Sequence, residues 1–499
     1  MGAVRSATVT EAPLHPRRLQ PHVIVAVLSV SASFLNIMDI TIVNVALPAL
    51  SRDFHASTSS IGWVVTGYLL SLAVWIPASG WIGDRFGTKR TFIFALGAFT
   101  AASALGSLAQ SLPQLVAARI LQGVGGGLLI PVAQAMLFRA FPPERRAAAA
   151  KILIIPTALA PASGPLIGGV LIDHLSWRWV FLVNLPLGIA ACVFAAILLD
   201  EHTEVTAGPF DAVGFLLSGG GLAALLYAMS AGPNDGWTSV PVAASGIGGA
   251  LALVILVVFE LGTPFPMLML RLLRVRLFAA CNAASLFATA AFLGTLFAVP
   301  LFLQDVRGES ATTSGSTTFP EAVGLLVVSQ VAARLYPRVG PRRLMMGGLA
   351  AMSATLVVMS RIAIDTNLWL IRAGMFTLGG CFACMIMSLQ AAAFATISSA
   401  DTGRAAALFS AQRQVASALG VAAIATTIAL VARTPISGAI ADAAATADHV
   451  HAFHITFLVA AAIAAVGCLI ASRVSDAAAA ATMQRGPRHA ESPETVLAH

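Results

Sequence analysis

Two ionisable side chains of opposite charge lie inside apolar stretches of this sequence, where burial changes their chemistry. Asp39 is the single ionisable residue of "FLNIMDITIVNVALP" (34–48), and Arg119 lies in "ARILQGVGGG" (118–127), three residues before Gln122. A carboxylate away from water can hold or release a proton, because burial favours its neutral form and a nearby cation favours its charged form. The residue types therefore point to reversible proton binding at Asp39, with Arg119 as its partner.

Helix geometry places the two charges at the same depth. We predict that each charge lies in a helix that crosses a membrane. At about 1.5 Å per residue, Asp39 lies about 12 Å inside the predicted outer end of its helix near Leu47. By the same rule, Arg119 lies about 8 Å inside the predicted outer end of its helix near Gln114. A charge in mid-membrane costs about 2.5–3.5 kcal/mol on insertion scales, so it normally faces a cavity or a partner. At 100° per residue, one polar stripe of about 140° comprises Ser29, Ser33, Asn36, Asp39 and Asn44. A carboxylate that merely joins two helices is the structural alternative.

Further polar residues in apolar segments are candidates for a substrate cavity, namely Asn36, Asn44, Gln122, Glu321 and Arg413. Glu321 lies about 6 Å inside the predicted outer end of its segment, which fits a second protonation or cation-recognition site as well as an interfacial carboxylate. Arg413, between Gln412 and Gln414, fits either a cavity position or a structural position.

Cofactor and metal chemistry receive little support from the residues. The sequence "DHVHAFH" brings together His449, His451 and His454; this spacing could bind a transition metal, but solvated loop histidines explain it better. No Gly-x-x-x-x-Gly-Lys-Ser/Thr loop for ATP is present. We therefore predict no metal site and no cofactor, and an ion gradient as the energy source for any transport.

The composition excludes a soluble chain. Of 499 residues, 58% are hydrophobic and only 10% are charged, with a mean hydropathy of +0.86, whereas soluble domains carry about 25% charged residues. So few charges cannot cover a surface of this size in water. We predict an all-α polytopic membrane protein whose main contact is the lipid bilayer.

Segments of roughly 20 apolar residues, the length needed to cross a bilayer, occur fourteen times. They lie near 23–47, 60–80, 91–110, 114–138, 152–172, 178–199, 209–230, 241–261, 278–303, 318–336, 344–362, 368–396, 405–432 and 453–472. With a cytoplasmic N-terminus, 21 of the 29 lysines and arginines fall on the inner side and 6 on the outer side, as the positive-inside rule requires. The positive-inside distribution thus explains the formal net charge of +7, and we predict no nucleic-acid partner.

A short internal repeat divides the chain into two halves. "DRFGTKR" (84–90) follows the second segment and "PRVGPRR" (337–343) follows the tenth, 253 residues later, with Asp84 replaced by Pro337. Two related halves around a midplane site are the usual construction of a secondary transporter. We predict a cytoplasmic tail (1–22), a six-helix bundle (23–200), two inserted helices (201–265), a second six-helix bundle (266–472) and a disordered cytoplasmic tail (473–499).

Several motifs, in the right order, resemble the major facilitator superfamily and within it the fourteen-span drug:proton antiporters. They are "MDITIVNVALP", "GWIGDRFGTKR" (80–90), "ARILQGVGGG", "ASGPLIGGVL" (162–171), "SWRWVFLVNLPLG" (176–188), "PLFLQDVRGES" (300–310) and "RQVASALGVA" (413–422). The resemblance covers about residues 23–472. It implies two six-helix bundles plus two central helices, with both termini in the cytoplasm.

The resemblance also implies roles for two of these motifs. The loop motif, with Gly80, Gly83, Asp84, Arg85, Gly87, Lys89 and Arg90, would be a conformational latch between the halves. Independently of the family, Asp84 can pair with cations or with the positive end of a helix. Gly164 and Gly168, four residues apart, permit close helix contact. With Pro165 and Gly169 they form the antiporter motif, which would seal the cavity and favour exchange.

From these observations we predict a monomeric, proton-coupled exporter of small amphipathic compounds in the cytoplasmic membrane, without enzymatic activity. Asp39 and Arg119 would couple proton and substrate movement. A metabolite importer or symporter of the same fold remains an alternative, against which "SGPLIGG" (163–169) argues. A non-transporting sensor is a second alternative, although the chain lacks a long soluble loop or signalling segment.

Overall fold

The computed structural model describes residues 20–56, 58–142, 174–203, 208–398, 400–432 and 443–483. Between 143 and 173 it describes residues 152, 156, 159–161, 163, 164, 167–172. Within these ranges all regular secondary structure is helical, with no strand. The all-α prediction is therefore confirmed for this part of the chain.

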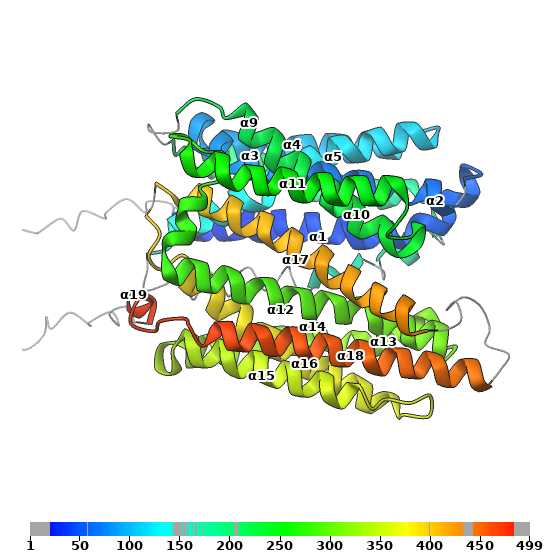
Figure 1. The fold of residues 1–499 in the computed structure, drawn as a ribbon. Coiled ribbons are helices and arrows are strands. Elements are labelled where there is room, and N and C mark those ends of the chain that lie inside the picture. Colours follow the sequence, from blue (N-terminus) through cyan, green and yellow to red (C-terminus); the bar gives the residue numbers. More distant parts are fainter. Residues whose placement is uncertain are drawn as a thin grey trace, which may run out of the picture.

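The helices of the first 200 residues form one bundle (Figure 1). They are α1 (Pro21–Asp53), α2 (Thr58–Ile61), α3 (Trp63–Phe86), α4 (Thr88–Ser107), α5 (Leu112–Ala140), α7 (Arg178–Leu182) and α8 (Asn184–Leu198). Helix α5 is the centre of this bundle, because α1, α3 and α4 all pack against it, while α8 packs against α4 and α1. We call these helices the first bundle.

The helices after residue 275 form a second bundle. They are α12 (Arg276–Leu301) with the π-turn η4 (Phe302–Val306), α13 (Ala311–Thr318), α14 (Pro320–Val339), α15 (Pro341–Met359), α16 (Leu368–Ala393), α17 (Thr402–Val431), α18 (Ala443–Ala471) and α19 (Ala480–Met483). Helices α14 and α15 pack on α16, whereas α17 and α18 pack on α12. Helix α17 also crosses to α3 and α5 of the first bundle.

A helical hairpin between the two bundles touches both of them. It consists of α9 (Ala212–Phe215), the π-turn η2 (Leu216–Gly220), α10 (Gly221–Asp235) and α11 (Val240–Gly262), and the 3₁₀ turn η3 (Leu270–Arg274) links it to α12. Helix α10 packs against α3 on one side and α17 on the other, and α11 packs on the outside of α10.

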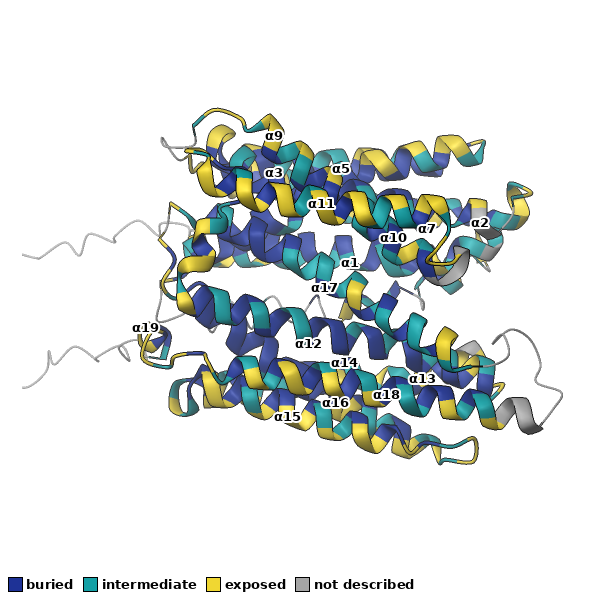
Figure 2. Cartoon of the chain, viewed as in Figure 1, coloured by how far each residue is buried: buried dark blue, intermediate teal, exposed yellow. Residues whose placement is uncertain are grey.

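Figure 2 shows exposed residues along the outward faces of the bundles, and many of them are large apolar side chains. Ile197 and Trp369 are each 72% exposed, and Leu430 is 80% exposed. So many large apolar side chains exposed on one molecule are unfavourable in water and mark contact with lipid. Together with the span lengths, this exposure identifies a multi-pass membrane protein.

Ten helical segments among the described residues are long and apolar enough to cross a membrane, and each coincides with a predicted span. Helices α4, α14 and α15 occupy three further predicted positions but fall short of that apolar criterion. The remaining predicted span, 152–172, lies largely outside the described residues. Fourteen spans and the orientation of the termini therefore stay predictions.

The two repeated loops have the same local structure. Gly87 (φ +97°) and Gly340 (φ +83°) adopt left-handed backbone conformations that favour glycine. In each half a carboxylate then binds the first turn of the next helix: Glu201 accepts from the Lys89 amide at 3.0 Å, and Asp476 accepts from the Arg342 amide at 2.9 Å. Glu201 lies in the segment that follows α8, and Asp476 lies in the segment that follows α18, which supports the internal repeat.

The prediction of disorder after residue 472 is wrong for 473–483, while 484–499 lie outside the described residues. Val474 and Ala479 are buried, α19 closes the segment, and the hydroxyls of Tyr336 and Thr482 lie 2.8 Å apart. The alanine-rich sequence hid this order, because alanine favours helices and the contacts that fix the segment come from distant residues.

Candidate functional site

Helix α1 turns most of its polar stripe inward. Ser29, Ser33, Asn36 and Asp39 are all buried, and Asp39 has no exposed surface at all. Asn44 is exposed instead, since it lies at the edge of the stripe, about 140° around the helix from Asp39. The burial of Asp39 requires partners for its charge.

Three side chains from two other helices bind the Asp39 carboxylate. Arg119 Nη1 lies 2.6 Å from Oδ2, and Gln122 Nε2 and Asn184 Nδ2 donate to Oδ1 at 2.9 and 3.0 Å. The predicted pairing of Asp39 and Arg119 is thus present in the geometry. Sequence reasoning missed Asn184; its one signal was a polar residue in the apolar run "FLVNLPLG" (181–188). We call Asp39, Arg119, Gln122 and Asn184 the buried polar cluster.

The Arg119 guanidinium is held on several sides. Its Nε donates to the Val64 carbonyl at 3.0 Å, its Nη1 also reaches Gln122 Oε1 at 2.6 Å, and the group lies 4.2 Å from the centre of the Tyr68 ring. Only 1% of the residue is exposed, and its Nη2 has no hydrogen-bond partner within the described part of the chain. A buried pair of this kind depends on both members, because losing one leaves an uncompensated charge.

Glycines of α5 bring α1 and α3 close enough to build this cluster. A Cβ at Gly123 would lie 2.6 Å from Ser71 Cβ, and one at Gly126 would lie 2.7 Å from Tyr68 Oη and 2.8 Å from Asn36 Nδ2. Side chains at these positions would push the helices apart. Gly123 and Gly126 therefore allow α1 and α3 to pack closely against α5 next to Arg119.

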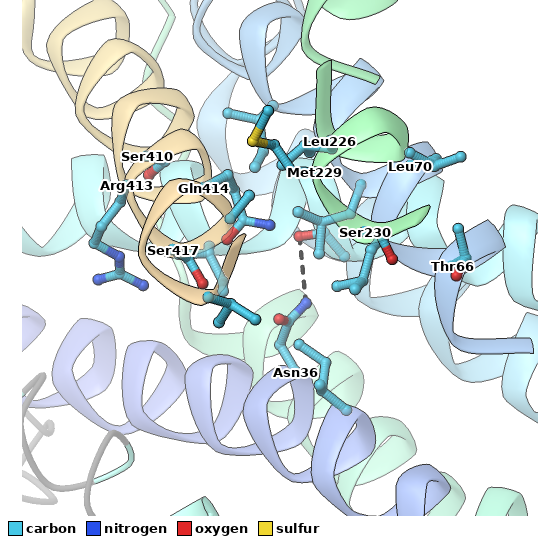
Figure 3. A pocket seen from close by; sticks show the side chains of 18 of the residues that line it. Asn36, Thr66, Leu70, Leu226, Met229, Ser230, Ser410, Arg413, Gln414 and Ser417 are labelled. Carbon is cyan, nitrogen blue, oxygen red and sulfur yellow. Dashed lines mark hydrogen bonds between the residues drawn. The ribbon is translucent and has the colours of Figure 1, made fainter. Parts of the chain in front are cut away.

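A cavity of about 340 Å³ opens beside the cluster, between α1, α3, α5, α10 and α17 (Figure 3). Of the five predicted cavity residues, Asn36 and Arg413 line it. Gln122 instead binds Asp39, Asn44 faces outward, and Glu321 lies in the first turn of α14. The contribution of the inserted hairpin, through Leu226, Met229 and Ser230 of α10, was not anticipated from the sequence.

The loop motif joins the two bundles at the end that the charge distribution predicts to be cytoplasmic. Asp84 is buried and binds Arg139 of α5 at 2.9 Å, and its other oxygen lies 3.8 Å from Arg404 Nε of α17. Gly80 permits this approach, because a Cβ there would lie 3.1 Å from the Arg404 Cα. Among the other motif residues, Gly83 and Gly87 are buried, Lys89 is partly exposed, and Arg85 and Arg90 are exposed.

Four buried phenylalanines lie at the same end of the molecule. The rings of Phe138 and Phe394 stack at 4.5 Å, and Phe394 also meets Phe278 and Phe409 edge to face at 6.4 and 6.1 Å. Phe138 belongs to the first bundle, and the other three come from the second bundle or directly follow its helix α16. This aromatic cluster and the Asp84 contacts close one end of the interface between the bundles.

The motif predicted to act in antiport packs directly against α1. A Cβ at Gly164 would lie 2.9 Å from Thr41 Cβ, and one at Gly168 would lie 2.9 Å from Ile42 Cγ1. Gly169 has open space around its Cα, and Pro165 lies outside the described residues. Two of the four motif residues therefore meet α1 within one turn of Asp39.

Metal ligands are not gathered anywhere in the described residues, where no group of three or more histidine, cysteine or acidic side chains could hold an ion. Of the three histidines before the last helix, His454 contacts the Ile362 carbonyl through Nε2 at 2.7 Å. The side chains of the buried polar cluster and of the cavity offer charge, hydrogen bonds and apolar contact.

Comparison with known proteins agrees with this architecture. Residues 30–421 match the sequence model of the Major Facilitator Superfamily. The "Multidrug resistance protein B homolog" of Mycobacterium tuberculosis (strain H37Rv) is 33% identical over 397 residues, which cover 79% of this chain and 74% of the relative. The "Uncharacterized MFS-type transporter YhcA" of Bacillus subtilis is 32% identical over 428 residues, 84% of this chain and 79% of that protein.

Among solved structures, the human organic anion transporter MFSD10 (TETRAN) aligns with a TM-score of 0.65 over 91% of this chain and all of that one. At 12% sequence identity this likeness concerns the fold alone. The sequence matches extend over most of the chain and over most of the relatives. They show that this chain belongs to the major facilitator superfamily.

Proposed function

We propose that the protein is a proton-coupled exporter of small amphipathic compounds, with Asp39 as the proton-binding group. The observation that carries the proposal is the position of Asp39 on α1. It is fully buried against Arg119, while Asn36 and Ile40 on either side of it line the cavity. A change in the protonation of Asp39 can therefore move a wall of the substrate cavity. The name of the mycobacterial relative, a multidrug resistance protein homolog, agrees with export of drug-like compounds.

The coupling follows from the charge balance of the buried polar cluster. With Asp39 ionised, its charge offsets that of Arg119, and α1, α5 and α8 are held together. A proton on Asp39 removes the ionic attraction and leaves Arg119 without its counter-charge, which favours a different packing of α1. Access to Asp39 from the outside would load the proton and release substrate. Access from the cytoplasm would release the proton and allow substrate to bind again.

The Asp84 contacts and the aromatic cluster would form the cytoplasmic gate of this cycle. Both lie at the same end of the bundle interface and both join the two bundles. In the present structure these contacts are made, which on the proposed topology would correspond to a state closed toward the cytoplasm. The cavity lies just beyond them, since Ser410 at its edge directly follows Phe409.

Everted membrane vesicles provide the test. Substrate addition should release protons from acidified vesicles that hold the wild-type protein, as read by a pH-sensitive dye, and Asp39→Asn should abolish this release. Asp365→Asn is the matched control, because Asp365 is exposed in a loop, and it should behave as wild type. Proton-driven export by the Asp39→Asn variant at the wild-type rate would refute the assignment.

We further propose the topology that the charge distribution predicts, with fourteen spans, both termini in the cytoplasm, and a monomer in the cytoplasmic membrane. The bundles at 23–200 and 266–472 would then be the moving halves, and 201–265 the inserted pair. Reporter fusions at Gln110, Gly236 and Arg361 should all report the outer side. A cytoplasmic signal from any of them would require a different topology.

A further inference from the structure

The cavity has an uneven distribution of charge. Arg413 is the only ionisable residue among the described residues that line it. Asp39, the nearest acidic side chain on α1, does not line the cavity, has no exposed surface and already accepts from three donors. The described walls of the cavity therefore present a cation and no anion.

Arg413 also has no acidic partner in the part of the chain that the structure describes. Each ion pair found there involves other residues. The predicted span 152–172 lies largely outside the described residues, but its sequence contains no Asp, Glu, Lys, Arg or His. That span can therefore add no charge to the cavity, whatever its position.

The surroundings of Arg413 suit the polar end of a ligand. Ser410, Arg413, Gln414 and Ser417 recur at helical spacing along α17 and line the cavity. In Figure 3 the Arg413 side chain extends from one edge of this cavity-lining face and the Gln414 side chain from the other. This face supplies a guanidinium, two hydroxyls and an amide, all of which can donate hydrogen bonds to an oxyanion. Arginine is well suited to this task, because its fork matches the geometry of carboxylates.

The opposite walls suit an apolar ligand body. Leu69 and Leu70 of α3, Ile130 of α5, and Leu226 and Met229 of α10 line the cavity, and Figure 3 shows Leu70, Leu226 and Met229 across from α17. Methionine adapts to ligands of different shape. A volume of about 340 Å³ lies at the lower end of the range for small-molecule sites.

We propose that the cavity selects amphipathic organic anions, with a carboxylate or sulfonate bound to Arg413 and the apolar body against α3 and α10. This inference rests on the proposed function, because it takes the cavity to be the transport site. It goes further in assigning the charge of the substrate and in giving the inserted helix α10 a part in binding.

A consequence for energetics follows from charge conservation. If one monovalent anion leaves the cytoplasm while one proton enters, two positive charge equivalents move inward in each cycle. Transport is then driven by the membrane potential as well as by the pH gradient. Exchange of a monovalent cation for one proton would move no net charge.

A binding experiment tests the charge preference without transport. The purified protein in lipid nanodiscs is titrated with three fluorescent probes: dansyl-phenylalanine, which is a carboxylate; its neutral methyl ester; and dansylcadaverine, which is a cation. We expect the carboxylate to bind most tightly. Arg413→Gln should weaken carboxylate binding about tenfold or more while leaving the affinity for the ester unchanged, and Arg413→Lys should retain part of the affinity.

Arg372→Gln is the matched control. Arg372 also belongs to the second bundle, but it lies over the Trp369 ring and does not line the cavity. This variant should bind all three probes as the wild type does. Equal wild-type affinity for the acid and the ester, or equal effects of the Arg413 and Arg372 substitutions, would overturn the inference.

A second measurement separates this inference from the proposed function. In everted vesicles, a lumen-positive potential set with potassium and valinomycin should accelerate uptake of the carboxylate probe, and Arg413→Gln should remove most of this uptake. If the carboxylate binds through Arg413 but moves no protons, the charge preference stands and proton coupling fails. If the cationic probe exchanges for protons and the carboxylate does not, coupling stands and the anion preference fails.

Discussion

Arg119 and Arg413 lie within long helices of opposite bundles, and they differ in nearly every respect except residue type. Arg119 in α5 is 1% exposed, lies 2.6 Å from a carboxylate and is covered by an aromatic ring. Arg413 in α17 is partly exposed, lines a cavity and has no acidic partner among the described residues. Both carry the cost of a charge within the membrane region, but among the described residues only Arg119 has a counter-charge.

This difference suggests a division of labour between the bundles. On the proposed mechanism, Arg119 would respond to the protonation of the carboxylate with which it is paired. Arg413, which has no acidic partner among the described residues, would gain its counter-charge from an anionic substrate. The two lie on opposite sides of the interface, and Asn36, one helical turn from Asp39 on α1, faces the cavity that Arg413 also lines.

Removing Arg119 should have the largest effect. Arg119→Gln leaves the Asp39 carboxylate buried without a cation, so we expect a loss of about 3–5 kcal/mol in stability and no proton-coupled transport. Thermal unfolding of the detergent-purified protein, together with vesicle assays, measures both. The double variant Asp39→Asn/Arg119→Gln should regain much of the stability but none of the coupling. An unaltered melting temperature for Arg119→Gln would contradict this prediction, because it would show that water compensates the Asp39 charge.

Breaking the Asp84 contacts should have an intermediate effect. Asp84→Asn weakens two charged interactions between helices, each worth about 1–3 kcal/mol, and shifts the protein toward a state open to the cytoplasm. In a variant without its five native cysteines, a cysteine at Ser410 should then be labelled several-fold faster in everted vesicles. Asp476→Asn is the control, since Asp476 caps α15 within the second bundle. Asp476→Asn should leave the labelling rate unchanged. If Asp84→Asn also left the rate unchanged, the Asp84 contacts would have no gating role.

The sequence predicted some of these features well and others not at all. Asp39 and Arg119 were paired correctly because helix rise and the polar stripe depend only on local geometry. Asn184, Phe394 and the α10 residues were missed, since their contribution depends on which helices become neighbours, and spacing along the chain does not contain that information. Asn44 shows the same limit, because a position at the edge of a helical stripe can face either way.

A smaller effect is expected at Asn184, where one of three donors to Asp39 is lost. Asn184→Ala removes a hydrogen bond of 3.0 Å and should lower stability by about 1–2 kcal/mol, while Arg119 and Gln122 still hold the carboxylate. Export should be slower but still coupled to protons, as measured in everted vesicles. Complete loss of coupling would place Asn184 on a level with Arg119 and would show that the cluster acts as an indivisible unit.

The smallest effect on stability should come from Arg413, although its substitution should strongly change substrate binding. Arg413→Gln removes a charge that has no partner in the described structure, so the melting temperature in the absence of ligand should stay the same or rise slightly. A carboxylate ligand should stabilise the wild type against heat in proportion to its concentration and should stabilise Arg413→Gln much less. If the variant instead melted as early as Arg119→Gln, Arg413 would have a counter-charge within the protein, and the two arginines would be structural equivalents.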